Sequence, residues 1–229
     1  PLESKGDHHR QAWYGCACCP SQISRFLPSI GNYIYGTSNE AIWVNLYIGN
    51  STEINTDNTN VTLRQETNYP WDGTVTPSNP LKKEIRLRIP SWCEQYTLSV
   101  NGQLVKAPTE KGYAVLNKEW KQGDVISLSM EMPVKLMTAD PRVKQNIGKR
   151  AIQRGPLVYC MEEVDNPQDF DNLKIAANTS FNAQFNPKLL NGITTIKATT
   201  NELAITLIPY YTWDNRKAGK MKVWIDYNE

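Results

Sequence analysis

Short segments in which apolar and polar residues alternate dominate the chain from about residue 37 onward, and this two-residue period limits the folds open to it. An apolar side chain at every second position predicts a strand with one buried face, as antiparallel strands have. Asn101-Gly102, between two such segments, is a hairpin signal. The predicted strands of this part are residues 41–48, 61–65, 84–89, 96–100 and 125–130. We therefore expect an all-β fold of antiparallel β-sandwiches of jelly-roll type.

A second set of strand-like segments follows a turn-like stretch at Ala139-Asp140-Pro141. Its predicted strands are residues 156–161, 194–198, 203–208 and 221–225. Residues 162–172 are polar and are expected to form a surface loop. A chain of 229 residues can bury two cores. We therefore predict one β-sandwich over residues 37–139 and a second over residues 140–229.

Residues 1–36 carry the one convincing helical pattern, predicted from Pro20 to roughly Gly36 with a possible kink at Pro28. Its apolar residues recur at helical spacing and form one face. These are Ile23, Phe26, Leu27 and Ile30. Because the β-rich remainder offers no matching helix, we expect this helix to be the last piece of a helical domain N-terminal to the sequence.

Three cysteines lie within four positions, in the segment Cys16-Ala17-Cys18-Cys19-Pro20. Cys18 and Cys19 fall at the predicted helix start, where unpaired backbone N–H groups favour a thiolate. A thiolate can act as a nucleophile or bind a soft metal ion. The segment is therefore a candidate metal or reactive-thiol site, although two cysteines from one loop cannot complete a tetrahedral zinc site.

The alternative is that these cysteines are small buried hydrophobic residues, or that one of them forms a disulfide with Cys93 or Cys160. Five cysteines is an odd number, and their clustering argues against a disulfide framework. We expect the cysteines to be mostly reduced or metal-bound, with Cys93 and Cys160 as buried free thiols in strand-like surroundings.

Charge and hydropathy exclude several kinds of partner. The 25 basic and 23 acidic residues nearly balance and form no basic run, so neither nucleic acid nor an anionic membrane surface is predicted. No apolar run approaches the ~20 residues needed to cross a bilayer, so a soluble protein is expected. The first residue is Pro1, and the numbering is expected to begin inside a longer chain. The compartment, cytoplasmic or periplasmic/secreted, and the oligomeric state stay open.

The aromatic residues fall into two groups. Those within or beside predicted strands are expected in the core, where they contribute large buried areas, and are Trp43, Trp92 and Trp224. Those near turn-like sequence could form a sugar-binding surface, and are Trp71, Tyr210, Tyr211 and Trp213.

With these residues laid out, the chain resembles the C-terminal part of glycoside hydrolase family 127, the β-L-arabinofuranosidase family. The resemblance extends along the full length, and the cysteine motif is its most specific part. The segments that carry it are residues 13–20, 68–73, 89–93, 153–159, 209–216 and 221–224.

The resemblance implies an α/α barrel that carries the active site and is followed by two β-sandwich domains, with residues 1–36 as the barrel's last segment. It further implies a zinc ion held by one Glu and three Cys. One of these cysteines is the nucleophile of a retaining hydrolysis. On this motif Cys18 would be nucleophile and zinc ligand, Cys19 a second ligand, and Cys16 a supporting residue.

The remaining ligands and the acid/base Glu belong to the barrel in that family, and no spacing in this chain assigns them a substitute. The residues considered were Glu3, Asp7, His8, His9 and Glu40. We therefore expect the C-terminal portion of a zinc-dependent retaining glycosidase acting on arabinose-containing glycans, inactive and weak in zinc binding on its own. The alternative is a non-catalytic β-sandwich module that binds carbohydrate or protein.

Overall fold

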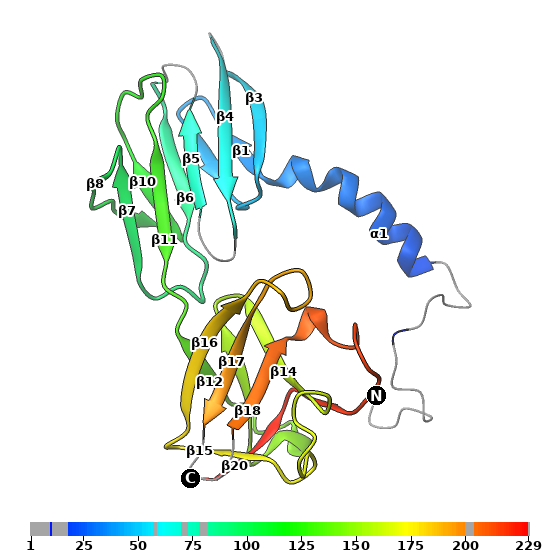
Figure 1. Ribbon diagram of the computed structural model, residues 1–229. Coiled ribbons are helices and arrows are strands. Elements are labelled where there is room, and N and C mark those ends of the chain that lie inside the picture. The colour runs from blue at the N-terminus through cyan, green and yellow to red at the C-terminus, as the bar shows by residue number, and fades with distance from the viewer. Residues whose placement is uncertain are drawn as a thin grey trace. The chain divides into compact units, whose positions relative to one another are not determined.

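A computed structural model of the chain describes residues 10, 18–56, 59–69, 73–77, 82–199 and 204–228. Contacts divide the chain into two compact units (Figure 1). We call Gly15–Met132 the first β unit, and Pro133–Glu229 together with Pro1–Tyr14 the second β unit.

The described residues of the first β unit form one α-helix, one 3-10 helix and two β-sheets. The helices are α1 (Cys18–Ser29) and η1 (Ile30–Tyr33). One sheet has the order β1-β2-β6-β10-β9, with β1 (Tyr35–Thr37), β2 (Ala41–Val44), β6 (Glu84–Arg88), β10 (Tyr113–Leu116) and β9 (Thr109–Glu110). The other has the order β3-β4-β5-β11-β7-β8, with β3 (Asn50–Thr56), β4 (Thr59–Thr67), β5 (Gly73–Pro77), β11 (Ile126–Met130), β7 (Tyr96–Val100) and β8 (Gln103–Leu104). The pairing of β2 with β6 is parallel, which the predicted antiparallel pattern did not include.

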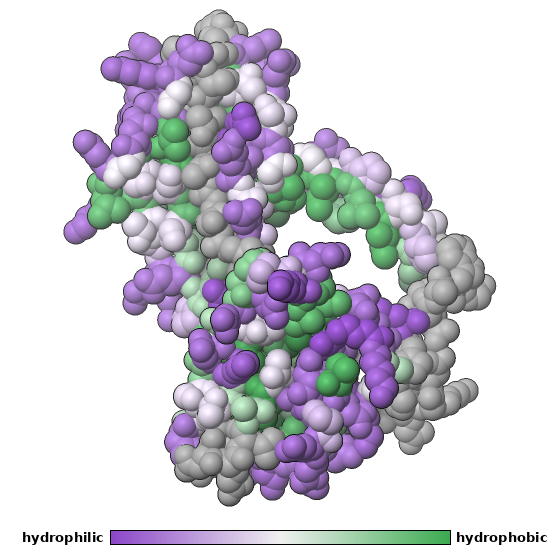
Figure 2. Space-filling view, viewed as in Figure 1, coloured by the Kyte–Doolittle hydropathy of each residue, from purple (hydrophilic) through white to green (hydrophobic). Residues whose placement is uncertain are grey.

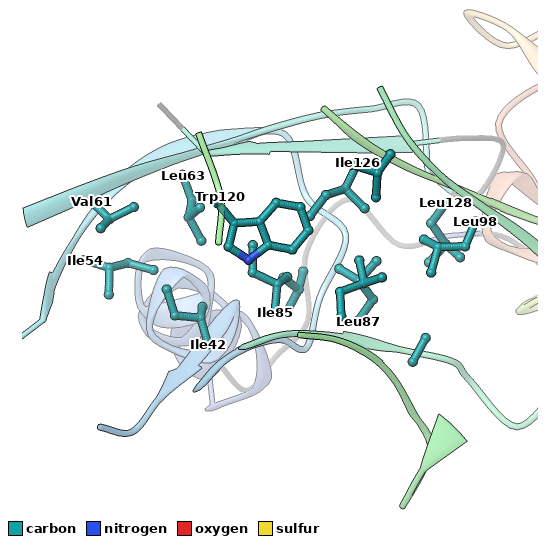
Figure 3. Close-up of a cluster of buried hydrophobic side chains, with 14 residues drawn as sticks. Ile42, Ile54, Val61, Leu63, Ile85, Leu87, Leu98, Trp120, Ile126 and Leu128 are labelled. Atoms are coloured by element: carbon teal, nitrogen blue, oxygen red, sulfur yellow. The ribbon is translucent and has the colours of Figure 1, made fainter. Parts of the chain in front are cut away.

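The core of the first β unit draws side chains from both sheets (Figure 3). Ile42 and Ile85 come from one sheet, whereas Leu63 and Ile126 come from the other, and all four are fully buried. Trp120, 1% exposed, joins them and donates its indole N–H to the Lys83 carbonyl at 3.0 Å. Two sheets that share one apolar core form a sandwich.

The β7–β8 hairpin turns at Asn101 and Gly102, with φ angles of 52° and 78°, as predicted from this pair. Asn101 Nδ2 donates to Asp124 Oδ1 at 2.8 Å, and the Lys121 backbone N–H donates to Asp124 Oδ2 at 3.0 Å. With Lys118 nearby at 3.1 Å, these contacts, the Asn101 hydrogen bond above all, lower the pKa of Asp124 to about 2. The buried carboxylate thus ties the hairpin to the turn before β11.

The second β unit forms a nine-stranded sheet. Seven strands follow the order β15-β20-β13-β14-β18-β17-β16, while β12 pairs with β13 and β19 pairs with β14. Their bounds are β12 (Val134–Met137), β13 (Lys149–Arg154), β14 (Leu157–Glu162), β15 (Lys174–Ala176), β16 (Ser180–Asn186), β17 (Ile193–Thr199), β18 (Ala204–Pro209), β19 (Met221–Lys222) and β20 (Ile225–Asn228). The unit also has the 3-10 helices η2 (Lys144–Asn146) and η3 (Tyr210–Thr212).

The division between the units lies at Met132/Pro133 instead of the expected 139/140. The reason is β12, which lies before the predicted boundary yet pairs with β13 along its whole length. The described residues nevertheless form mostly β-strands and one α-helix, as the alternating and helical patterns predicted.

Strand β14 is buried on both faces over residues 159–162. Tyr159 and Met161 belong to one apolar cluster, which includes Ile205 from β18. Cys160, between them in sequence, belongs to a second cluster with Ile208. The Tyr159 hydroxyl is satisfied by the Thr194 carbonyl at 3.0 Å.

The predicted surface loop over residues 162–172 is mostly exposed or half-buried, as expected, but Glu162, Asn166 and Phe170 are buried. Glu162 and Asn166 are 4% and 5% exposed, and Phe170 lies in the apolar core. Asn166 Nδ2 donates to the Glu162 and Thr206 carbonyls at 2.8 and 2.9 Å. These hydrogen bonds take the place of the bonds to water that the amide loses on burial.

Helix α1 begins two residues before the predicted start and ends at Ser29, well before Gly36, which lies in β1. Pro28 lacks an N–H group, and the chain continues as the 3-10 helix η1. None of the α1 residues is buried, and Ile23, Phe26 and Leu27 are 58%, 53% and 58% exposed. Figure 2 shows these apolar side chains as a green band along the helix.

Within the described ranges, no helix is long and apolar enough to cross a membrane.

Candidate functional site

The candidate site consists of two adjacent free thiols, Cys18 and Cys19, in the first turn of α1. Both side chains are exposed, and their Sγ atoms lie 3.7 Å apart. Ser21 Oγ donates to the Cys18 carbonyl at 3.0 Å, and Ser24 Oγ donates to the Pro20 carbonyl at 2.9 Å. Both thiols therefore lie exposed on the same hydrogen-bonded turn of the helix.

The spacing of the two sulfur atoms fits a shared zinc ion. Tetrahedral zinc with Zn–S distances of ~2.3 Å places two sulfurs about 3.8 Å apart, close to the 3.7 Å between Cys18 and Cys19. Two thiols supply half of a four-ligand site. Within the part of the chain that the structure describes, no group of three or more His, Cys, Asp or Glu side chains could hold a metal.

The other residues considered as ligands do not change this geometry. Cys16, Glu3, Asp7, His8 and His9 lie outside the described residues. Glu40 is described and is exposed in the turn before β2, where its backbone N–H donates to Ser38 Oγ.

Cys93 and Cys160 are buried free thiols, as the sequence predicted, and no disulfide joins any of the four described cysteines. Cys93 Sγ donates to the Gln95 carbonyl at 3.2 Å. Burial raises the pKa of Cys160 to about 12, so this thiol stays protonated at neutral pH. Neither cysteine has the exposure of a nucleophile.

A second polar arrangement, in which Arg10 meets the segment Tyr210–Arg216, was not predicted from the sequence. The Arg10 guanidinium donates to the carbonyls of Trp213 at 2.5 Å and Tyr211 at 3.1 Å, and its backbone N–H donates to the Asp214 carboxylate. Because these partners lie about 200 positions away, local pattern could not bring them together. The signal available was the unusual composition of residues 209–216.

Comparisons with known proteins agree with this fold. The family described as "Beta-L-arabinofuranosidase, GH127 middle domain" matches residues 41–132, and the "Glycoside hydrolase family 127 C-terminal domain" matches residues 134–226. The matches place the chain among the glycoside hydrolases. It belongs to glycoside hydrolase family 127, as the family's C-terminal part.

Individual relatives support the assignment. A "Non-reducing end beta-L-arabinofuranosidase" of Bifidobacterium longum subsp. longum is 33% identical, over 94% of this chain and 38% of its own. The crystal structure of a GH127 β-L-arabinofuranosidase from Geobacillus stearothermophilus T6 is similar with a TM-score of 0.86 and 38% identity, over 97% of this chain and 39% of that one. A second solved structure, of a GH127 β-arabinofuranosidase, is similar with a TM-score of 0.89 and 34% identity, over 100% of this chain and 41% of that one. The chain thus spans about two fifths of the length of these relatives.

Proposed function

We propose that this chain is the C-terminal portion of a zinc-dependent retaining glycoside hydrolase that acts on arabinose-containing glycans, with Cys18 as nucleophile. The observation that carries the proposal is the pair of exposed thiols 3.7 Å apart at the start of α1. Family membership and relatives named β-L-arabinofuranosidase supply the substrate class.

In the proposed mechanism Cys18 Sγ attacks the anomeric carbon while the glycosidic C–O bond breaks, and a general acid protonates the leaving oxygen. The same group, now deprotonated, takes a proton from a water molecule as that water displaces the sulfur, so the thiolate is regenerated and the sugar keeps its anomeric configuration. A bound zinc ion would keep both thiols ionised at neutral pH. Cys19 would hold its neighbour's sulfur in place through the shared ion. We assign the general acid and the other two ligands to the part of the relatives that lies outside residues 1–229.

The two β units would support the catalytic part, as jelly-roll-like sandwiches attached to an α/α barrel. The exposed apolar face of α1 favours this role, because such a face needs a partner that the described β strands do not supply. Residues 1–229 alone would then bind zinc weakly and would not hydrolyse glycosides.

The test compares full-length enzyme carrying Cys18→Ala, Cys18→Ser or Cys19→Ala with the parent, measuring hydrolysis of an aryl β-L-arabinofuranoside and zinc content. We expect both Cys18 variants to lose at least ~10³-fold in kcat, and all three to lose zinc. Cys93→Ala is the matched control, because that cysteine is buried and lies in a turn remote in sequence from the motif. A Cys18→Ala enzyme with parental kcat would refute the nucleophile assignment.

A binding role is the second candidate, favoured by a surface groove of about 750 Å³ in the first β unit. Its lining includes Gln103 and Asn117, whose side-chain amides can hydrogen-bond sugar hydroxyls. Saturable binding of arabinan fragments by residues 1–229, abolished by Gln103→Ala, together with full activity of the Cys18 variants, would favour this role over catalysis.

A further inference from the structure

The turn of the β7–β8 hairpin (Figure 1) places an asparagine amide directly before a glycine, at Asn101 and Gly102. Asn101 is exposed, so water reaches the turn. A Cβ atom added to Gly102 would meet nothing within 4 Å, and glycine has no side chain of its own to shield its backbone N–H. The turn therefore contains the two groups that take part in asparagine deamidation, an amide carbon and an open backbone nitrogen beside it.

Deamidation joins these two groups and releases ammonia. The Gly102 nitrogen attacks Asn101 Cγ, the new C–N bond forms, and the Cγ–Nδ2 bond breaks. The Nδ2 group leaves as ammonia with the proton of the Gly102 N–H. Water then opens the cyclic imide at either of its carbonyls and leaves aspartate or isoaspartate in place of the asparagine. Because attack turns Cγ from planar to tetrahedral, both atoms of the side-chain amide have to move.

Two hydrogen bonds hold the amide of Asn101 in place. Its Nδ2 donates to Asp124 Oδ1 at 2.8 Å, and its Oδ1 accepts from the Val125 backbone N–H at 2.8 Å. The Asp124 carboxylate is itself fixed by the Lys121 backbone N–H at 3.0 Å, and with a pKa of about 2 it stays charged at neutral pH. Hydrogen bonds to a charged group are stronger than those between neutral groups. Deamidation of Asn101 therefore has to break a charge-assisted hydrogen bond first.

We propose that Asn101-Gly102 is a latent deamidation site that Asp124 keeps closed, and that it reacts only when the hairpin detaches from the turn before β11. The rate of reaction is then set by local opening of the first β unit. The inference does not depend on the role proposed for the thiols.

The product prevents the hairpin from closing as before. Aspartate at this position has a carboxylate oxygen where the Nδ2 group of Asn101 lay 2.8 Å from Asp124 Oδ1. Two carboxylates at that distance repel each other unless one of them binds a proton. Deamidated chains therefore record that the hairpin has opened.

A second asparagine–glycine pair, Asn191 and Gly192 in the second β unit, provides an internal reference. This pair also has left-handed backbones, with φ angles of 64° and 99°. Asn191 is exposed, and no carboxylate among the described residues bonds to its side chain. Its deamidation rate therefore responds to pH and temperature but not to Asp124.

The experiment incubates the chain at mildly alkaline pH, below its melting temperature, and measures deamidation of Asn101 and Asn191 by peptide mass spectrometry. Asp124→Ala should raise the Asn101 rate roughly 10–100-fold, the factor that a hydrogen bond to a charged group contributes. Lys118→Ala is the matched control, because Lys118 contacts the other oxygen of Asp124 at 3.1 Å and leaves the Asn101 bond in place. This control should change the Asn101 rate less than ~threefold. Asn191 should keep one rate in all three proteins.

Unfolded in urea, the parent and both variants should deamidate Asn101 at one common rate, which is faster than that of the folded parent. A folded parent that reacts as fast as the unfolded chain would overturn the proposal, as would equal Asn101 rates in the folded parent and Asp124→Ala. A rate at Asn191 that rises together with that at Asn101, or an equal rise in Lys118→Ala, would assign the effect to general loosening and would equally overturn the role of Asp124.

Asn101→Asp tests the consequence of deamidation and leaves Asp124 unchanged. Its urea midpoint at pH 7 should be lower than that of the parent, and the difference should shrink as the pH falls and one of the two carboxylates binds a proton. Asn191→Asp makes the same change in the reference turn and is the control for the added charge. A parental midpoint for Asn101→Asp at pH 7 would show that the hairpin closes over the new carboxylate, which contradicts the proposal.

Discussion

Replacing Asp124 by Asn should destabilise the first β unit by a pH-dependent amount. The side chain is 7% exposed and accepts hydrogen bonds from Asn101 Nδ2 and the Lys121 backbone N–H. The fall of its pKa from 3.8 to about 2 corresponds to about 2 kcal/mol of stability at neutral pH. Asparagine keeps one acceptor but loses the charge and turns an N–H₂ group toward one of the donors.

The sign of the pH dependence follows from the direction in which folding shifts the pKa of Asp124. Because the folded-state pKa of Asp124 lies below its ordinary value of 3.8, its stabilisation is fully present above pH ~4 and is lost as the pH falls to about 2. The difference between the parent and Asp124→Asn should therefore be largest at pH 7 and should shrink toward pH 2.

The assay is urea unfolding at pH 7, 5, 3.5 and 2.5, followed by a deuterium pulse and peptide-resolved mass spectrometry of β7 and β11. At pH 7 the expected loss corresponds to a midpoint shift of about 1–2 M urea. Asp140→Asn is the control, because Asp140 is an exposed carboxylate paired with the exposed Arg142, and its midpoint should stay parental. Equal midpoints for Asp124→Asn and the parent at pH 7, or a difference at pH 2.5 as large as the difference at pH 7, would refute the reasoning.

Two further predictions concern burial. Leu63→Ala removes a fully buried side chain from the core of the first β unit and should lower the free energy of unfolding by about 2–5 kcal/mol. The control Leu104→Ala, at a position 77% exposed, should change the free energy of unfolding by less than ~0.5 kcal/mol. Iodoacetamide at pH 8 should alkylate exposed Cys18 in zinc-free protein and leave Cys160, whose pKa is raised to about 12, unmodified. A native-state adduct on Cys160 would show that its burial is not maintained in solution.

Local alternation predicted the strands well where one face is buried and the other is not. Residues 84–88, 96–100 and 126–130 are strands with bounds close to those expected. The pattern could not say which sheets face each other, and so it did not single out Trp120, which is 1% exposed. Burial of an indole between two sheets depends on tertiary packing, which no window of sequence contains.

Where the sequence failed, a longer-range effect had overridden the local pattern. A surface loop was expected to begin at residue 162, yet Glu162 is the last residue of β14 and is buried, because Arg216, far along the chain, neutralises its charge. The same distinction separates the candidate thiol site from the contacts of Arg10. The two thiols are neighbours in sequence and could be predicted, whereas the contacts of Arg10 span about 200 positions and could not.

The burial of residues 159–162 of β14 on both faces affects how the second β unit unfolds. Met161 and Cys160 point into two different apolar clusters, so neither cluster can open without disturbing the strand on which the other is built. Local opening is therefore costly around β14, and its amides should exchange with solvent only in events that unfold the whole unit. The clusters behave as one cooperative block, with β14 as the strand that joins them.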